Sequence, residues 1–260
     1  MQLWTQEHLR TLPPAFLLML AASLLLRLFL KNKSLVLRRL PLQVIALLLI
    51  LLEVGKQTTS YRDGYDLYHL PFHFCSFVMI ALILAAFYRG RGEEWVRGVA
   101  ASWCWAAALM TLISPELIYP EHNIVELRES FLSFHTVAFH NLVILAALLI
   151  LFLELYIPQK GMRKRLFCTT AMACGLSALM AQLLQTNYAN MYRCHIEPLE
   201  ELRLALIEQI GATPTRVIYV TVVIALHLGF TQLSYLAYCL LQRALDRPAG
   251  QDVKKPQTDP

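Results

Sequence analysis

Long apolar runs alternate with short polar segments along almost the whole chain. Each run comes close to the roughly 20 residues that an α-helix needs to cross the hydrocarbon core of a bilayer. The pattern therefore predicts an all-α fold, a bundle of seven transmembrane helices joined by short loops. The expected spans are Pro13–Leu30, Leu40–Gly55, Leu70–Tyr88, Val96–Ser114, Phe131–Ile157, Leu166–Gln185 and Thr215–Leu241.

The composition agrees with a chain whose main solvent is lipid. Of the 260 residues, 57% belong to the hydrophobic set and 16% are charged, and the mean hydropathy is +0.49. Soluble domains have about 45–50% apolar and about 25% charged residues. We expect one membrane domain over residues 1–243 and a disordered cytoplasmic tail over residues 244–260. The first span is long for a signal-peptide core, so no cleavable signal peptide is expected.

Basic residues are concentrated after every second predicted span. Lys and Arg gather in cytoplasmic loops of membrane proteins, so this alternation predicts an N-terminus outside and a C-terminus in the cytoplasm. No basic stripe is interleaved with aromatic residues, so a nucleic-acid partner is not expected. The basic clusters are Arg27, Lys31, Lys33, Arg38 and Arg39; Arg89, Arg91 and Arg97; Lys160, Arg163, Lys164 and Arg165; and Arg243, Arg247, Lys254 and Lys255.

Polar and ionisable side chains recur in or beside the outer halves of the predicted spans. Such groups are costly inside a bilayer and mark functional sites. With the predicted orientation they share one depth, which indicates a polar pocket open to the outside. The candidates are Glu53, His69, His73, Cys75, His135, His140, Asn141, Gln185, Asn187, Tyr188 and Tyr219.

This set of side chains is suited to nucleophilic chemistry by a cysteine. A thiol becomes a nucleophile when a histidine or another positive group stabilises its thiolate. Cys75 follows Pro71 near a helix start, where free backbone N–H groups can hold an oxyanion. His135 or His140 would act as the base, and Glu53 would orient it. A structural role is the main alternative, because a cysteine in an apolar helix is usually inert and Glu53 has Lys56 and Arg62 nearby.

Metal and redox chemistry have weaker support. The six cysteines show no CxxC motif and no Cys/His ligand spacing, so we expect no metal and no cofactor. Two alternatives remain open. Histidines on two spans would be able to ligate haem or zinc, and Cys75 and Cys194, the two cysteines predicted outside, would be able to form a disulfide.

Three stretches resemble a known family. They are His69–Ser76 (HLPFHFCS), Ser130–His135 (SFLSFH), and Thr186–Asn190 (TNYAN) with Pro198–Glu201 (PLEE). Together they resemble the YwaF family of bacterial integral membrane proteins, which is similar to eukaryotic seven-span membrane acyltransferases that remodel ether phospholipids through a cysteine acyl-enzyme. The resemblance extends from the second span to the seventh and implies a bacterial plasma membrane and membrane lipids as partners.

The resemblance also implies roles for single residues. Cys75 matches the family cysteine, which is the nucleophile in the eukaryotic branch. His135 matches the family histidine, with His140 as the alternative register. His73, Asn187 and Tyr188 match further family positions, whereas Ser76 stands where the eukaryotic enzymes have a histidine after the cysteine.

Two classes of function follow from these features. The leading hypothesis is a cysteine-dependent phospholipid acyltransferase or lipid hydrolase with an outward-facing pocket. The alternative is a non-enzymatic protein that binds or transports a small ligand. No internal repeat or broken-helix pattern supports transport.

Overall fold

A computed structural model describes residues 3–246 of the chain, and this range contains helices and no strand. Within it, seven helical segments are long and apolar enough to cross a membrane. This confirms the predicted all-α, seven-span fold. The main helices are α1 (Gln6–Leu30), α2 (Leu35–Arg62), α3 (Phe74–Phe87), α4 (Glu93–Ile113), α7 (Phe131–Phe152), α8 (Met162–Leu184) and α10 (Ala212–Asp246).

Five shorter elements lie between these helices: η1 (Leu67–His69), α5 (Pro115–Ile118), α6 (Glu121–Val125), η2 (Tyr188–Asn190) and α9 (Glu197–Ile210). α9 was not among the helices expected from the hydrophobic pattern. It has Pro198 in its first turn, where proline is tolerated because that N–H has no partner within a helix. None of its residues is buried, and it packs on α10.

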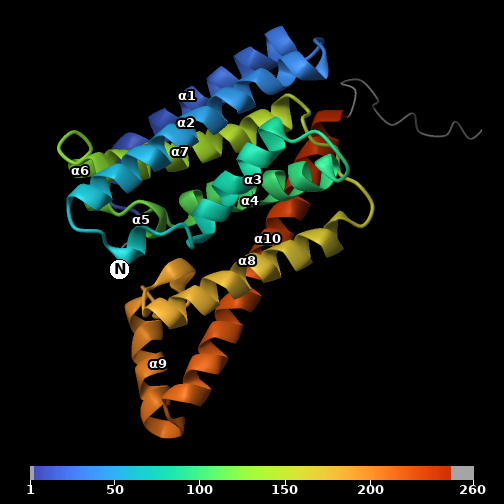
Figure 1. Cartoon of the computed structure of the whole chain (residues 1–260). Coiled ribbons are helices and arrows are strands. Elements are labelled where there is room, and N and C mark those ends of the chain that lie inside the picture. Colours follow the sequence, from blue (N-terminus) through green and yellow to red (C-terminus); the bar gives the residue numbers. More distant parts are fainter. Residues whose placement is uncertain (1–2, 247–260) are drawn as a thin grey trace, which may run out of the picture.

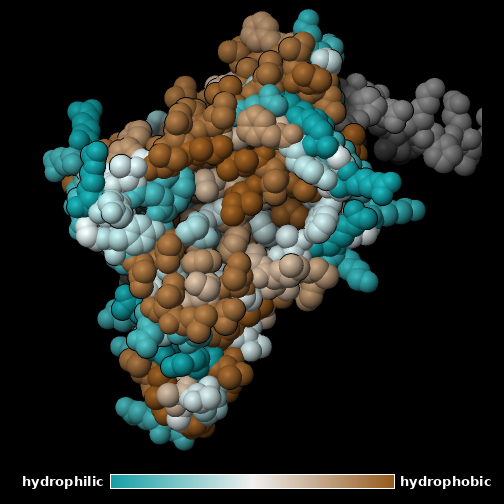
Figure 2. Space-filling view, in the orientation of Figure 1, coloured by the Kyte–Doolittle hydropathy of each residue, from teal (hydrophilic) through white to brown (hydrophobic). Residues whose placement is uncertain are grey.

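The helices form a layered bundle with one projecting arm (Figure 1). α1, α2 and α7 lie side by side, α3 and α4 lie next to them, and α8 crosses α10 on the other side of α4. α9 and the first half of α10 extend away from the other helices. The space-filling view in Figure 2 shows hydrophobic residues over the flanks and hydrophilic residues gathered at the two ends, as expected for a protein surrounded by lipid.

α4 is the central helix, and small residues allow its neighbours to approach. Ala100 and Ala101 are fully buried. A Cβ atom added to Gly98 would lie only 2.7 Å from Sδ of Met162. Two hydrogen bonds fix the packing: Ser102 Oγ donates to the carbonyl of Thr231 at 2.9 Å, and Trp103 Nε1 donates to Thr170 Oγ1 at 3.0 Å. Small residues and interhelical hydrogen bonds are the usual means of association in membranes.

Several helix ends differ from the predicted spans. α1 begins at Gln6 and carries Pro13 and Pro14 inside it, so the prolines do not mark its start. α2 continues past Gly55 to Arg62, because this glycine provides space for the ring of Phe131 and does not end the helix: a Cβ atom there would be 2.4 Å from the ring. α10 continues to Asp246, and the remainder of the predicted tail lies outside the described residues.

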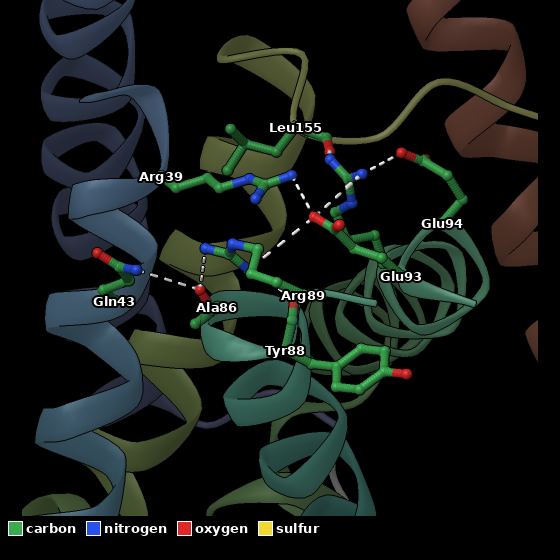
Figure 3. A network of polar contacts seen from close by, with 9 residues as sticks. Arg39, Gln43, Ala86, Tyr88, Arg89, Glu93, Glu94 and Leu155 are labelled. Atoms are coloured by element: carbon green, nitrogen blue, oxygen red, sulfur yellow. Dashed lines mark hydrogen bonds and ion pairs between the residues drawn. The ribbon is translucent and has the colours of Figure 1, made fainter. Parts of the chain in front are cut away.

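One end of the bundle, which we call the basic end, contains the loops between α1 and α2, α3 and α4, and α7 and α8, together with the end of α10. Glu93 lies at the centre of a charge network there (Figure 3). Its carboxylate pairs with Arg39 of α2 and lies 3.4 Å from Arg97 and 4.0 Å from Arg89. Arg97 also pairs with Glu94 and donates to the carbonyl of Leu155 at 3.0 Å. The network joins α2, α4 and the segment that follows α7.

We predict that Glu93→Gln destabilises the protein. The substitution leaves Arg39 and Arg97, whose side chains are 7% and 9% exposed, without their shared counter-charge. Breaking a buried pair costs about 3–5 kcal/mol, and Glu93 is partly exposed. We therefore expect the melting temperature of the purified protein in detergent to fall by about 5 °C.

Glu94→Gln is the matched control for Glu93→Gln. Glu94 is 40% exposed, and among the residues that the structure describes it pairs with Arg97 alone. Its substitution should shift the melting temperature by less than half as much. Equal shifts for the two variants would contradict a central role for Glu93.

The orientation of the bundle is a second prediction. Because basic loops stay in the cytoplasm, a peptide tag on the N-terminus should be removed by protease added to intact cells. A tag on the C-terminus should be removed only after the cells are permeabilised. The opposite pattern would reverse the orientation of every site described below.

Candidate functional site

The last turns of α2 carry a polar cluster at the end of the bundle opposite the basic end. Glu53, Lys56 and Gln57 are spaced so that they lie on one face of the helix. Lys56 Nζ lies 2.8 Å from Glu53 Oε2, and Gln57 Nε2 donates to Glu53 Oε1 at 2.7 Å. The Glu53 and Lys56 side chains are only 16% and 12% exposed. An ion pair this well buried requires further polar neighbours.

His135 of α7 is one of these neighbours. Its Nε2 lies 3.8 Å from Glu53 Oε2, and the side chain is 10% exposed. Among the described residues, this nitrogen has no hydrogen-bond partner. We call Glu53, Lys56, Gln57 and His135 the Glu53 cluster.

His140 and Asn141 lie elsewhere. A rotation of about 100° per residue separates the directions of His135 and His140 by about 140°. His140 donates from Nδ1 to the carbonyl of Thr136 at 2.8 Å, and its ring lies 6.1 Å from that of Tyr119. Asn141 faces α1 and α4. Of the two histidines considered as a base, only His135 adjoins Glu53.

Cys75 is the second residue of α3, directly after a break in the third span. The chain turns through Leu70–His73, which lies between η1 and α3. Gln57 stabilises this break from α2, because its Nε2 donates to the carbonyl of His69 at 2.8 Å. Within the described residues, the N–H groups of Phe74 and Cys75 have no acceptor. Two free donors therefore lie beside the thiol.

Cys75 is near the Glu53 cluster but does not bond to a histidine. Its thiol is free, and within residues 3–246 neither His135 nor His140 makes a hydrogen bond to it. The charged groups within electrostatic range of the thiol are Lys56 and Glu53. Cys194 is also a free thiol, so the two outer cysteines do not form a disulfide.

Lys56 is a functional candidate that the sequence pattern did not single out, since the sequence indicates it only as an ion-pair partner of Glu53. Its spacing from Glu53 and Gln57 is a helical signal, and α2 continues past the predicted end of the span at Gly55, so that Lys56 lies on the helix. Besides Glu53, its ammonium group is within electrostatic range of His69, His73, Cys75 and His135.

His73 and Tyr188 connect the break in the third span to the end of α8. His73 Nε2 donates to the carbonyl of Tyr68 at 3.0 Å, and its ring lies 5.3 Å from that of Tyr188. Tyr188 is fully buried, and its hydroxyl donates to the carbonyl of Leu67. Ser177 of α8 adds a 2.7 Å hydrogen bond to the carbonyl of Phe72. These contacts position the segment that carries Cys75.

Asn187 organises the loop after α8. Its Oδ1 accepts from the N–H groups of Tyr192 and Arg193, both at 3.1 Å, and its Nδ2 lies 3.0 Å from Nε2 of His195. Tyr219 of α10 holds the same loop by donating to the carbonyl of Asn190 at 2.6 Å. The predicted residues Asn187 and Tyr219 therefore use their polar atoms within the loop. Gln185 caps α8 with a left-handed backbone, φ 51°.

Glu200 is a further loop contact that the sequence analysis did not select. Its carboxylate accepts from the N–H of Cys194 at 2.9 Å and from Nε of Arg203 at 2.7 Å. The hydrogen bond from Arg203 lowers the pKa of Glu200. In residues 3–246, no group of three or more His, Cys, Asp or Glu side chains is arranged to hold a metal ion.

The fold and these contacts define a polytopic α-helical membrane protein with a polar site at one end of its bundle. A family model described as the TMEM164 family matches residues 3–235. The chain therefore belongs to the TMEM164 family, a family of multispan membrane proteins. No curated protein and no solved structure matches the chain.

The loop around Asn187 should loosen on mild acidification. Partial burial, followed by the nearby charge of Arg193, lowers the pKa of His195 from its ordinary value of 6.5. A lowered pKa means that the folded loop favours the neutral ring, whose Nε2 accepts from Asn187. The stabilisation is present above pH 6.5 and is lost as the pH falls below it.

Hydrogen exchange of residues 187–196, corrected for the intrinsic effect of pH, measures this loosening. When the pH is lowered from 7.5 to 5.5, we expect the exchange rate to rise by less than about tenfold. The rise is limited because pH 5.5 lies only about one unit below the ordinary histidine pKa, and each unit can change the stability of the loop by at most about tenfold. Glu200 stays ionised in this range because Arg203 lowers its pKa. His195→Gln retains an acceptor that does not titrate and should remove the pH effect. An unchanged effect in that variant would show that another group is responsible.

Proposed function

We propose that this chain is a cysteine-dependent phospholipid acyltransferase or lipid hydrolase that uses Cys75 as its nucleophile, as its resemblance to the YwaF family implies. One observation carries the proposal: a free thiol lies at the start of α3 beside two backbone N–H groups that have no acceptor within residues 3–246, and it is within electrostatic range of Lys56. This combination supplies a nucleophile, oxyanion donors and a positive charge in one place.

The thiolate is the reactive form of Cys75. Burial and the nearby Glu53 disfavour a charged sulfur, and in this proposal Lys56 and the N-terminus of α3 offset that cost as the proton leaves. Glu53 balances the charge of Lys56 and orients His135, whose Nε2 lies 3.8 Å from the carboxylate. His135 is the base in this proposal, and it has to come within hydrogen-bond distance of Cys75 when a substrate binds, since catalytic hydrogen bonds often form only in the substrate complex.

The reaction proceeds in two halves. Cys75 loses its proton to His135, and its sulfur attacks the ester carbonyl of a phospholipid. The N–H groups of Phe74 and Cys75 hold the oxyanion. The ester C–O bond breaks, and the departing lysolipid oxygen takes the proton from His135. The hydroxyl group of a lysolipid, or water, then gives its proton to His135 as its oxygen attacks the thioester carbonyl. The C–S bond breaks, the Cys75 sulfur takes the proton back from His135, and the product is a new ester after acyl transfer or a free fatty acid after hydrolysis.

The location of the site suits a membrane lipid. The Glu53 cluster lies in the last turns of the second span, and in a bilayer the ends of spans lie close to the ester bonds of lipids. With the orientation predicted from charge, the site faces the outside of the plasma membrane. Tyr65 adds a contact to the Glu53 cluster, because its hydroxyl donates to Gln57 Oε1 at 2.6 Å.

The alternative is a non-enzymatic protein that binds or transports a small ligand. It is favoured by one observation, the absence of a hydrogen bond between Cys75 and His135 or His140 within the described residues. In this case the Glu53 cluster would recognise a polar ligand, and Cys75 would be part of the lining.

We predict that Cys75→Ala abolishes acyl transfer. The full-length protein in lipid nanodiscs is supplied with a phospholipid that carries a fluorescent acyl chain, and transfer to a lysolipid or to water is measured. The variant should lose activity by about a thousandfold or more, since a missing nucleophile removes the covalent path. It should also lose the hydroxylamine-sensitive acyl adduct that a thioester would give.

Cys168→Ala is the control, because Cys168 is an exposed thiol on the half of α8 nearer the basic end. Its activity should equal that of the parent. Lys56→Met should slow adduct formation by about tenfold or more, since the thiolate loses its nearby cation. If Cys75→Ala turns over lipid as well as the parent does, the acyltransferase proposal fails and the binding alternative stands.

A further inference from the structure

A cavity of about 310 Å³ lies between α1, α4 and α7. It is lined by carbon atoms from Leu12, Phe16, Leu112 and Ile144, and by the polar side chains of Thr111 and Asn141. His135 and Asn141 point about 120° apart on α7, so this cavity is separate from the Glu53 cluster. Ligand pockets in proteins have volumes from roughly 300 to 1,000 Å³.

The wall formed by α1 is held at both ends. Near its start, the fully buried His8 donates from Nε2 to the carbonyl of Tyr119 at 3.0 Å. Near its end, Arg27 Nη1 donates to the carbonyl of Phe152 at 2.6 Å. Between these two contacts α1 stands away from α4, and the space between them is the cavity. The cavity is therefore part of the fold.

The buried side-chain oxygen of Asn141 in this lining lacks a hydrogen-bond partner within residues 3–246. Its Oδ1 is buried without a hydrogen bond, and its side chain makes none to any described residue. The hydroxyl of Thr111 already donates to the carbonyl of Ala107 at 2.9 Å. An unpaired buried amide is costly, so the amide of Asn141 indicates an occupant that both donates and accepts a hydrogen bond.

The rest of the lining excludes a water-filled cavity. An ordered water needs two to four polar partners, and carbon atoms form almost all of these walls. The rim faces lipid, since Leu17 is 63% exposed and Leu112 is 43% exposed on the flank of the bundle. A hydrocarbon chain from the bilayer matches both the walls and the opening.

We propose that this cavity binds a single hydrocarbon chain that ends in a hydroxyl group, with the hydroxyl at Asn141. The hydroxyl donates to Oδ1 and accepts from Nδ2, and the chain lies along Leu12 and Phe16 toward the rim. Long-chain alcohols and protonated fatty acids share this chemistry. The site does not use Cys75, so it does not depend on the proposed acyl transfer.

Photolabelling of the full-length protein in phosphatidylcholine nanodiscs tests the proposal. The probe is hexadecanol with a diazirine midway along its chain, and mass spectrometry maps the labelled residues. We expect saturable labelling within residues 4–19 and 111–144, competed by unlabelled hexadecanol. Cys75→Ala should label as the parent does, which separates this site from the acyl-transfer site.

Two tryptophan variants on one turn of α1 provide a matched pair. Leu17 lines the cavity, whereas Leu18, 72% exposed, is not part of the lining. Leu17→Trp should fill the opening and reduce saturable labelling by about fivefold or more, and Leu18→Trp should leave it unchanged. Equal labelling in both variants would mean that lipid surrounds the helix without a specific site, and the proposal would be wrong.

The hydrogen bond is tested by competition. Hexadecanol should compete about fivefold better than its methyl ether, which lacks the O–H donor. Asn141→Leu should remove this preference, and that variant keeps the proposal testable if Leu17→Trp fails to fold. Palmitic acid tests whether a protonated fatty acid binds as a long-chain alcohol does. If palmitic acid competes at pH 5 and no longer competes at pH 9, the protonated acid is a ligand. Equal competition by the alcohol and the ether in the parent protein would overturn the role of Asn141.

Discussion

The carboxylate of Glu93 compensates the arginine charges at the basic end of the bundle. Arg39 and Arg97 are almost fully buried there, and Glu93 is the acceptor that they share. A buried guanidinium without a counter-charge is strongly unfavourable, so α2 and α4 have to meet at Glu93. The hydrogen bond from Arg97 to the carbonyl of Leu155 adds the segment that follows α7. This arrangement holds one end of the bundle together and leaves the opposite end free to carry functional groups.

At the opposite end of the bundle, the need of buried charges for a counter-charge also shapes the candidate site. α2 carries Glu53 and Lys56 through Gly55 toward the bundle's end, and both side chains remain largely buried. Their charges are satisfied by each other and by Gln57, and Nε2 of His135 lies 3.8 Å from the carboxylate. The break in the third span places Cys75 beside this cluster, because Gln57 bonds to the carbonyl of His69 and Tyr188 bonds to that of Leu67. The nucleophile of the proposed reaction thus depends on contacts that also stabilise the fold.

α7 separates two different environments. On one face His135 meets the charges of α2, and on another Asn141 faces an apolar cavity beside α1. A helix turns about 100° per residue, so polar residues only a few positions apart serve different surroundings. The candidate acyl-transfer site and the proposed chain-binding cavity are therefore compatible within one bundle, with α7 forming a wall of each.

The sequence by itself determined the number of spans and the placement of basic loops after every second span. Hydropathy and Lys/Arg content are local properties of a segment, and they depend on its residues and not on its packing partners. The sequence also indicated Glu53, Cys75 and His135 as a group, since their spans run to the same end. It did not show which of His135 and His140 lies beside Glu53, or that Asn141 lies away from the Glu53 cluster. The rotation of a helix about its axis, and the helices it contacts, are set by tertiary packing. The roles of Lys56 and Glu93 are visible only in the tertiary structure. Lys56 reaches the candidate site because Gly55 lets α2 pass the ring of Phe131. Glu93 is central because three arginines lie around its carboxylate. A charge pattern predicts on which side of a membrane a charged residue lies, and the tertiary structure decides which side chains balance its charge.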